Sequence, residues 1–206
     1  MGWSKEEITP YETTVKDKEG NEKKVMVTMD DGVRPQTTVA SLGKLKPAFK
    51  KNGTSTAGNS SQVTDGAACV FLAKRSFAKK HNLPIEGRIL SYAVAGVPPE
   101  IMGVGPAYAI PLALEKTGLS VKDIDVWEVN EAFASQATYS VEALKIPKDK
   151  LNRRGGAIAL GHPLGMTGAR MICTLFSELK RTNEKYGVIS MCIGTGMGAA
   201  GVFERE

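Results

Sequence analysis

Three residues that could carry chemistry each lie at the end of a segment expected to form a strand. Asn130 follows the alternating run 124–129, His162 lies in a glycine-flanked His-Pro step, and Cys192 precedes the glycine-rich turn 194–198. In α/β proteins ligands bind beyond the carboxyl ends of the strands, so these side chains are expected to share one pocket. A carboxamide, an imidazole and a thiol beside a glycine turn are the groups that thioester and acyl chemistry uses.

Each of the three residues, taken alone, also has a purely structural interpretation. Asn130 is typical of a helix cap and Cys192 of a buried structural cysteine. His162 could form only a hydrogen bond across its turn, since most histidines are not catalytic. The glycines around His162 favour a functional role, because glycine lets the backbone and a ligand approach closely. A histidine held rigidly there suits acid–base catalysis near neutral pH.

The segments on either side of His162 are expected to be a strand and then a helix. Residues 155–160 form a small apolar run that is typical of a buried strand. Thr167 is predicted to cap the helix that follows. The apolar positions of that helix are spaced as one face: Met171, Ile172, Leu175, Phe176 and Leu179.

The rest of the chain predicts an α/β fold. From about residue 88, strands and helices alternate, with strands at 88–95, 124–129, 187–192 and 199–203 and helices at 107–116 and 134–144. With the run at 155–160, this pattern gives a mixed five-stranded sheet covered by helices. Ahead of it we expect a hairpin from 11–15 and 24–29, a buried strand at 67–73 and a short basic helix at 75–81.

Composition limits the function classes. The 206 residues are 42% hydrophobic and 24% charged, as in an ordinary soluble globular protein, and no apolar run reaches the length of a membrane span. The net charge is +5, but the basic residues do not form the stripe that nucleic-acid binding needs. Cys69, Cys173 and Cys192 have no paired spacing, which argues for a reducing compartment and against a disulfide framework or a metal site. The G-x-G-x-x-G letters at 196–201 are not expected to bind a dinucleotide, because that site needs a helix after the glycines.

Several longer motifs occur in a fixed order along the chain. They are Val33–Pro35, Lys46–Phe49, Thr56–Ser61, Asp65–Ala68, Met102–Pro106, Asn130–Phe133, Gly155–Arg170 and Cys192–Gly198. In this order they resemble the thiolase family, and most closely its peroxisomal members. The resemblance implies a thiolase-like α/β fold, of which this chain would be the C-terminal half. It also implies an acyltransferase that cleaves 3-ketoacyl-CoA by thiolysis in fatty acid β-oxidation.

The resemblance assigns roles to four residues. His162 would activate a nucleophilic cysteine, and Cys192 would move the proton at the α-carbon of the acetyl unit. Asn130 would hold a water that, with His162, stabilises the thioester enolate, and the N–H of Gly194 would contribute to a second oxyanion hole. These roles make physical sense, because so weak a carbon acid needs a nearby base and a stabilised oxyanion.

By the same resemblance, coenzyme A and acyl-CoA are substrates and no cofactor is permanently bound. The positions expected to contact these substrates are Arg34, Phe49, Ala57, Gly58, Ser61, Met102, Ala132 and Phe133, with Arg34 facing the phosphates. The full-length parent would be a homodimer in the peroxisome. No targeting signal is recognised in this chain, and the cytoplasm is the alternative location.

One departure from the family concerns the nucleophile. Thiolases carry their nucleophilic cysteine in an N-terminal half, and no residue of this chain matches it. We therefore expect a C-terminal portion that is inactive alone. Residues 1–62 would be a remnant of the substrate-binding loop domain, 63–87 the last strand and helix of the N-terminal domain, and 88–206 the C-terminal domain. The alternative is a noncatalytic fragment that binds CoA or docks a partner.

Overall fold

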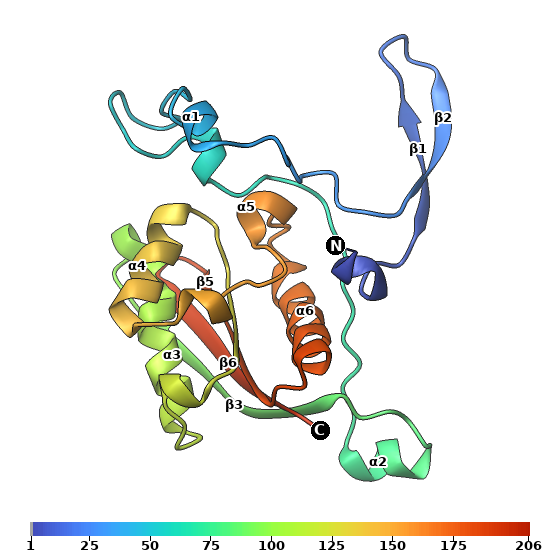
Figure 1. The fold of residues 1–206 in the computed structure, drawn as a ribbon, viewed down its shortest axis with the longest axis vertical. Helices are drawn as coiled ribbons and strands as arrows, with labels where there is room; N and C mark the ends of the chain where they lie inside the picture. The colour runs from blue at the N-terminus through green and yellow to red at the C-terminus, as the bar shows by residue number, and fades with distance from the viewer. Residues whose placement is uncertain (1) are drawn as a thin grey trace.

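A mixed four-stranded sheet forms the centre of the computed structural model, which describes residues 2–206 (Figure 1). Its strands lie in the order β3 (Gly87–Gly96), β6 (Met197–Arg205), β5 (Tyr186–Ile193) and β4 (Val126–Val129). β4 runs parallel to β5, whereas β6 is antiparallel to both of its neighbours. The predicted α/β class with a mixed sheet is confirmed.

Helices cover both faces of this sheet (Figure 1). α3 (Gly105–Glu115) and α4 (Ala134–Leu144) lie on one face, and α6 (Thr167–Thr182) lies on the other. α6 buries Met171, Leu175 and Leu179, three of the positions predicted to form its apolar face. Because successive side chains of a strand point to opposite faces, the buried residues form two clusters, one on each side of the sheet.

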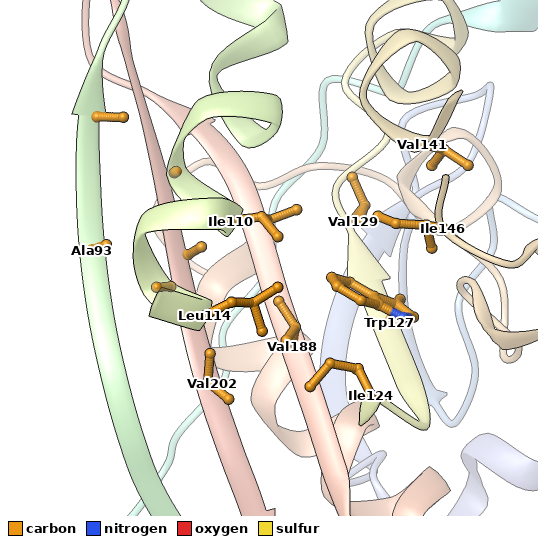
Figure 2. Close-up of a cluster of buried hydrophobic side chains, with 14 residues drawn as sticks. Ala93, Ile110, Leu114, Ile124, Trp127, Val129, Val141, Ile146, Val188 and Val202 are labelled. Carbon is orange, nitrogen blue, oxygen red and sulfur yellow. The ribbon is translucent and has the colours of Figure 1, made fainter. Parts of the chain in front are cut away.

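The larger cluster fills the space between the sheet and α3 and α4 (Figure 2). Trp127 and Val129 of β4 point into it beside Ile110 of α3 and Val141 of α4, and Trp127 is fully buried. The intervening residue of β4, Glu128, faces α6. Because side chains alternate along a strand, packing of Trp127 and Val129 on one face directs the next side chain, Asn130, toward the other.

The remaining elements are short or lie outside the core. The hairpin strands β1 (Tyr11–Lys16) and β2 (Glu22–Val27) pair antiparallel and project from the core, as does the loop that carries α1 (Val39–Leu42) (Figure 1). The predicted hairpin and the basic helix α2 (Arg75–Lys80) are both present. The other short helices are η1 (Trp3–Glu6), η2 (Ala57–Asn59), η3 (Pro99–Val104), η4 (Val121–Asp123), η5 (Lys148–Lys150) and α5 (Ala157–Leu160). None of the helices in residues 2–206 combines the length and the apolarity that a bilayer crossing requires.

The apolar run before His162 is the helical turn α5, so the prediction of a buried strand there is wrong. Gly155 and Gly161 flank the run with φ of +97° and +96°, a left-handed conformation that breaks an extended chain at both ends. Between them, the carboxylate of Glu131 accepts a hydrogen bond from the backbone N–H of Ile158 at 3.3 Å. This contact satisfies a donor in the first turn of the helix.

The edge of the sheet beside β4 carries a single bridge instead of a fifth strand. Leu151 forms one parallel bridge with Trp127, and the backbone N–H of Asn152 donates to the Trp127 carbonyl at 2.8 Å. Asn152 then takes a φ of +43°, which turns the chain away from β4. Within residues 2–206 the sheet therefore has four strands rather than five.

Residues 67–73 are not a strand, which corrects a second prediction. The segment is extended along the outside of the core, and Phe71 and Leu72 are 74% and 69% exposed. An apolar run becomes a strand only where a neighbouring strand can pair with it, and no strand of the described residues lies beside this one.

Candidate active site

The side chains of His162 and Asn130, two of the three residues expected to share a pocket, are in contact. Asn130 Nδ2 lies 3.2 Å from His162 Nε2, and Asn130 is 2% exposed. Asn130 directly follows β4, and its backbone N–H donates to the carbonyl of Ser190 in β5 at 2.9 Å. The carboxyl end of β4 thus carries the carboxamide to the imidazole, as expected for a site at a strand end.

The turn that carries His162 is held by the amino-terminal loop. The backbone N–H of His162 donates to the carbonyl of Gln62 at 3.1 Å, and the Gln62 amide donates to the carbonyl of Gly32 at 3.1 Å. The left-handed φ of Gly161 creates this sharp approach, and a Cβ there would lie 2.5 Å from a methyl group of Thr64. Glycine is therefore required directly before His162.

Burial lowers the pKa of His162 below its ordinary value of 6.5, and the positive charge of Arg170 lowers this pKa further. Both effects disfavour the imidazolium. The imidazole is consequently neutral near pH 7 and can act as a base. Its other nitrogen, Nδ1, lies 2.7 Å from Oγ1 of Thr167. Thr167 is the first residue of α6 and not its cap, so its predicted role was wrong.

Two side-chain amides, one half-buried and one buried, hold the end of β4, and the sequence analysis missed both. The Asn152 side chain forms two hydrogen bonds with the Val129 backbone: its Oδ1 accepts from the Val129 N–H and its Nδ2 donates to the Val129 carbonyl, each at 2.9 Å. The Gln136 amide donates to the Asn130 carbonyl at 2.8 Å. No local sequence signal predicts this pairing, because Asn152 is 23 residues from Val129 along the chain and meets it only in the folded protein. Asn130 Oδ1 is buried and has no hydrogen-bond partner among the described residues.

Cys192 and Gly194 lie at the same end of the sheet. Ser190 of β5 bonds to Asn130, and Cys192 is two residues further along that strand. Gly194, with a φ of +58°, begins the tight turn into β6. Burial raises the pKa of the Cys192 thiol above its ordinary value of 9.0, so the thiol is protonated near pH 7. Within residues 2–206 no hydrogen bond joins Cys192 to His162 or Asn130.

Four of the predicted substrate contacts gather beside Asn130. The N–H of Ser61 donates to the carbonyl of Ala132 at 2.9 Å, and Ser60 forms a bridge with Phe133. The rings of Phe49 and Phe133 stack edge to face with centroids 5.9 Å apart. The 49–61 loop is therefore docked on the Asn130–Phe133 turn, although no local sequence signal connects the two.

The other four predicted contacts have no hydrogen bond or ring contact to this group in the described residues. Ala57 and Gly58 belong to η2, and a Cβ on Gly58 would lie 2.5 Å from side-chain carbons of Leu42 and Leu45. Arg34 is exposed and donates to the Asp31 carbonyl at 2.5 Å. Met102 is half-buried in η3. Within the described residues, no hydrogen bond joins Arg34 or Met102 to the Ser61–Phe133 group.

Family models match almost the whole chain. The model described as "Thiolase, C-terminal domain" matches residues 83–205, and "Thiolase, N-terminal domain" matches residues 2–76. The chain belongs to the thiolase family. The thiolase-like fold expected from the motifs is also confirmed by solved structures. The dimeric peroxisomal thiolase of Saccharomyces cerevisiae is 54% identical with a TM-score of 0.87, and this chain covers 50% of it.

The similarity extends to named enzymes. Peroxisomal 3-ketoacyl-CoA thiolase of Homo sapiens is 63% identical over 199 residues, which are 96% of this chain and 47% of the human protein. Human mitochondrial 3-ketoacyl-CoA thiolase, solved in complex with CoA, is 45% identical with a TM-score of 0.89, and this chain covers 50% of it. This thiolase chain therefore spans about half the length of the curated relatives that it matches.

Proposed function

We propose that this chain forms the enolate-stabilising half of a thiolase active site. The reaction is thiolytic cleavage of 3-ketoacyl-CoA to acetyl-CoA and a shortened acyl-CoA. The observation that carries the proposal is the contact of Asn130 Nδ2 with His162 Nε2 at 3.2 Å. This contact lies at the end of the sheet where Cys192 is also found, on the neighbouring strand β5. Two groups that can donate to one oxygen in a partly buried site are what a thioester enolate requires.

In the proposed reaction, His162 Nε2 takes a proton from an attacking thiol. The thiolate then attacks the 3-keto carbon, and the bond between the α- and β-carbons breaks. Its electron pair becomes the enolate of acetyl-CoA, while the shortened acyl group stays on the attacking sulfur as a thioester. Protonated His162, together with Asn130 or a water that Asn130 holds, donates hydrogen bonds to the enolate oxygen. The backbone N–H of Gly194 serves the second oxyanion hole.

Cys192 completes the step as a proton donor. Its buried thiol has a raised pKa, so it carries the proton that the α-carbon of the enolate must receive. Transfer of that proton gives acetyl-CoA and leaves a Cys192 thiolate. The Cys192 thiol is restored when it takes the proton of the CoA thiol. The CoA thiolate then removes the acyl group from the attacking sulfur, which leaves as a thiolate and recovers its proton from His162.

The attacking thiol is proposed to come from outside these residues. Burial raises the pKa of the Cys173 thiol, which makes it a poor nucleophile, and this cysteine lies within α6 rather than on a glycine turn. Cys69 is exposed on the 67–73 segment. The same proposal divides the chain into three parts: residues 1–62 from the substrate-binding loop domain, 63–87 from the N-terminal domain, and 88–206 as the C-terminal domain.

Coenzyme A and acyl-CoA are the proposed partners, bound as substrates. Phe49, Ser61, Ala132 and Phe133 support this assignment, because they form one surface beside Asn130. A homodimer and a peroxisomal location are proposed from the names of the relatives, which include a dimeric peroxisomal thiolase.

The test is thiolysis by a chain that joins these 206 residues to the N-terminal half of a thiolase. We expect turnover of 3-ketoacyl-CoA that falls by at least about 100-fold in His162→Ala, the usual size of a general-base contribution. His81→Ala is the matched control, because His81 is an exposed residue at the end of α2. A wild-type rate in His162→Ala would remove the proposed base.

A noncatalytic fragment that binds CoA is the second candidate, favoured by the position of Cys69 and Cys173 outside the Asn130–His162 site. Thiolysis by the joined chain described above separates the two candidates, whereas mass spectrometry of the 206-residue chain after incubation with 3-ketoacyl-CoA tests whether this chain holds a nucleophile of its own. We expect no acyl adduct on any cysteine. An adduct on Cys69 or Cys173 would show that the chain holds its own nucleophile.

A further inference from the structure

We infer that Thr167 is a positioning residue that fixes His162 in one tautomer, with the proton on Nδ1 and the lone pair on Nε2. The role of Nε2 as the catalytic base rests on the proposed function. The tautomer itself is a property of this chain and can be measured without turnover.

The inference begins with the single proton of the Thr167 hydroxyl. Thr167 Oγ1 lies 2.7 Å from His162 Nδ1 and 3.0 Å from the carbonyl oxygen of Pro163. A carbonyl oxygen can only accept, so the hydrogen bond between these two oxygens uses the single hydroxyl proton. The hydroxyl therefore donates to Pro163 and has only lone pairs left for the imidazole. His162 Nδ1 must then carry the proton and donate it to Thr167.

The other side of the ring is consistent with this assignment. Asn130 Nδ2, an amide donor, faces His162 Nε2 at 3.2 Å, so Nε2 is the accepting nitrogen. Each donor in the series from Asn130 through His162 and Thr167 to Pro163 then has one acceptor. The opposite tautomer would direct an Nε2–H toward the Asn130 amide group and leave the Thr167 proton to be shared between two acceptors.

The surroundings of Thr167 make it a rigid support. Its side chain is 1% exposed, and its residue begins α6, where its own N–H also donates to the Pro163 carbonyl at 3.0 Å. A buried threonine in the first turn of a long helix has little rotamer freedom. Because Thr167 is neutral, it orients the imidazole without the charge stabilisation that a carboxylate would give to the imidazolium. His162 can therefore accept a proton at Nε2 and readily pass it on.

The test is ¹⁵N NMR of the imidazoles in the 206-residue chain. Only two histidines are present, and His81→Gln assigns the remaining signals to His162. In the neutral ring we expect Nδ1 to resonate as a protonated nitrogen and Nε2 as an unprotonated one. In Thr167→Val, which removes the hydroxyl at nearly constant volume, we expect the ratio of Nδ1–H to Nε2–H to fall about fivefold, the effect of one hydrogen bond of typical net strength. Thr167→Ser should retain the wild-type ratio.

Two results would overturn the inference. One is a wild-type ring with its proton on Nε2, and the other is a ratio that does not change in a folded Thr167→Val chain. If the valine variant does not fold, Thr167→Ala replaces it, and the wild-type tautomer decides independently of both. Loss of thiolysis in His162→Ala with no tautomer effect of Thr167 would support the proposed function and refute this inference. A tautomer ratio that changes in Thr167→Val, together with unchanged thiolysis in His162→Ala, would support this inference and refute the proposed function.

Discussion

At the scale of single residues, Glu128 shows how burial changes a protonation state. Its carboxyl group is fully buried on β4, with Arg170 Nη1 3.3 Å from Oε2, while Oε1 has no partner in the described part of the chain. Burial raises its pKa from 4.5 to about 8, although Arg170 opposes the rise. Glu7, the next contributor, raises the pKa further through charge repulsion. The folded protein therefore holds a proton on Glu128 at pH 7.

Glu128→Gln should remove this linkage. The folded state binds more protons than the unfolded state between pH 4.5 and about 8, so the wild-type contribution to stability falls as pH rises through that window. Relative to wild type, we expect the variant to gain up to about 1.4 kcal/mol per pH unit across it. Urea unfolding at several pH values measures the difference. The lowered pKa of His162 acts in the opposite direction below pH 6.5 and cancels in the comparison. Parallel curves for the two proteins would contradict the raised pKa.

The candidate site was predictable at the residue scale only in part. His162, Asn130 and Cys192 stand out because each is an unusual residue at the end of an apolar run, whereas Gly194 is a candidate only through the family resemblance. Thr167 was misread, since a threonine before an amphipathic helix is usually its cap. Its contact with His162 depends on the geometry of the turn between them, which the local sequence pattern does not predict.

At the scale of elements, a buried charge cluster joins α6 to the N-terminal turn η1. Glu178 of α6 has a fully buried side chain that accepts from Arg154 Nε at 3.0 Å and from Arg181 at 2.5 and 2.9 Å. Arg154 also donates to the Trp3 carbonyl at 2.7 Å and to Glu7 at 2.6 Å. The pKa of Glu178 is lowered by these arginines in spite of its burial, so the carboxylate is charged.

Arg154→Leu should destabilise the protein by about 2–4 kcal/mol. The substitution leaves Glu178 buried with a smaller set of partners, which is the costly way to break an internal ion pair. Lys180→Leu is the control on the same helix. Its ammonium meets Glu86 at 3.8 Å with both side chains more than half exposed, so the urea midpoint should scarcely move. Equal losses in the two variants would show that the Arg154 cluster adds no stability.

The elements differed in how well they could be predicted. α6 was located because its apolar positions are spaced as one face of a helix, and β3, β5 and β6 because they contain apolar runs. The runs at 155–160 and 67–73 are equally apolar, yet they became a helical turn and an exposed extended segment. Their fate depends on neighbours: Glu131 and two left-handed glycines in the first case, and an absent partner strand in the second.

At the scale of the whole molecule, the chain has a packed part and an extended part. The two hydrophobic clusters lie entirely between Ala93 and Phe203, and residues before β3 run along or away from this core (Figure 1). The alternation of strands and helices after residue 88 predicted the packed part. No sequence pattern predicts the docking of the 49–61 loop on the Asn130–Phe133 turn, because the two segments are about 75 residues apart and share no periodicity. Only the family resemblance assigns both segments to one substrate.

Limited trypsin digestion should separate these two parts. Lys74, Lys79 and Lys80 are exposed around the short helix α2, where few backbone hydrogen bonds resist local opening. We expect early cleavage there and a resistant fragment that begins near Asn82 and ends at the carboxyl terminus. Because Trp3 would be removed, the fluorescence of the purified fragment would report Trp127 alone, which is fully buried. A blue-shifted emission that unfolds cooperatively in urea would show that the sheet and its helices form a stable unit. Simultaneous cleavage within 88–206, or a red-shifted Trp127, would instead show that the core depends on the segments before it.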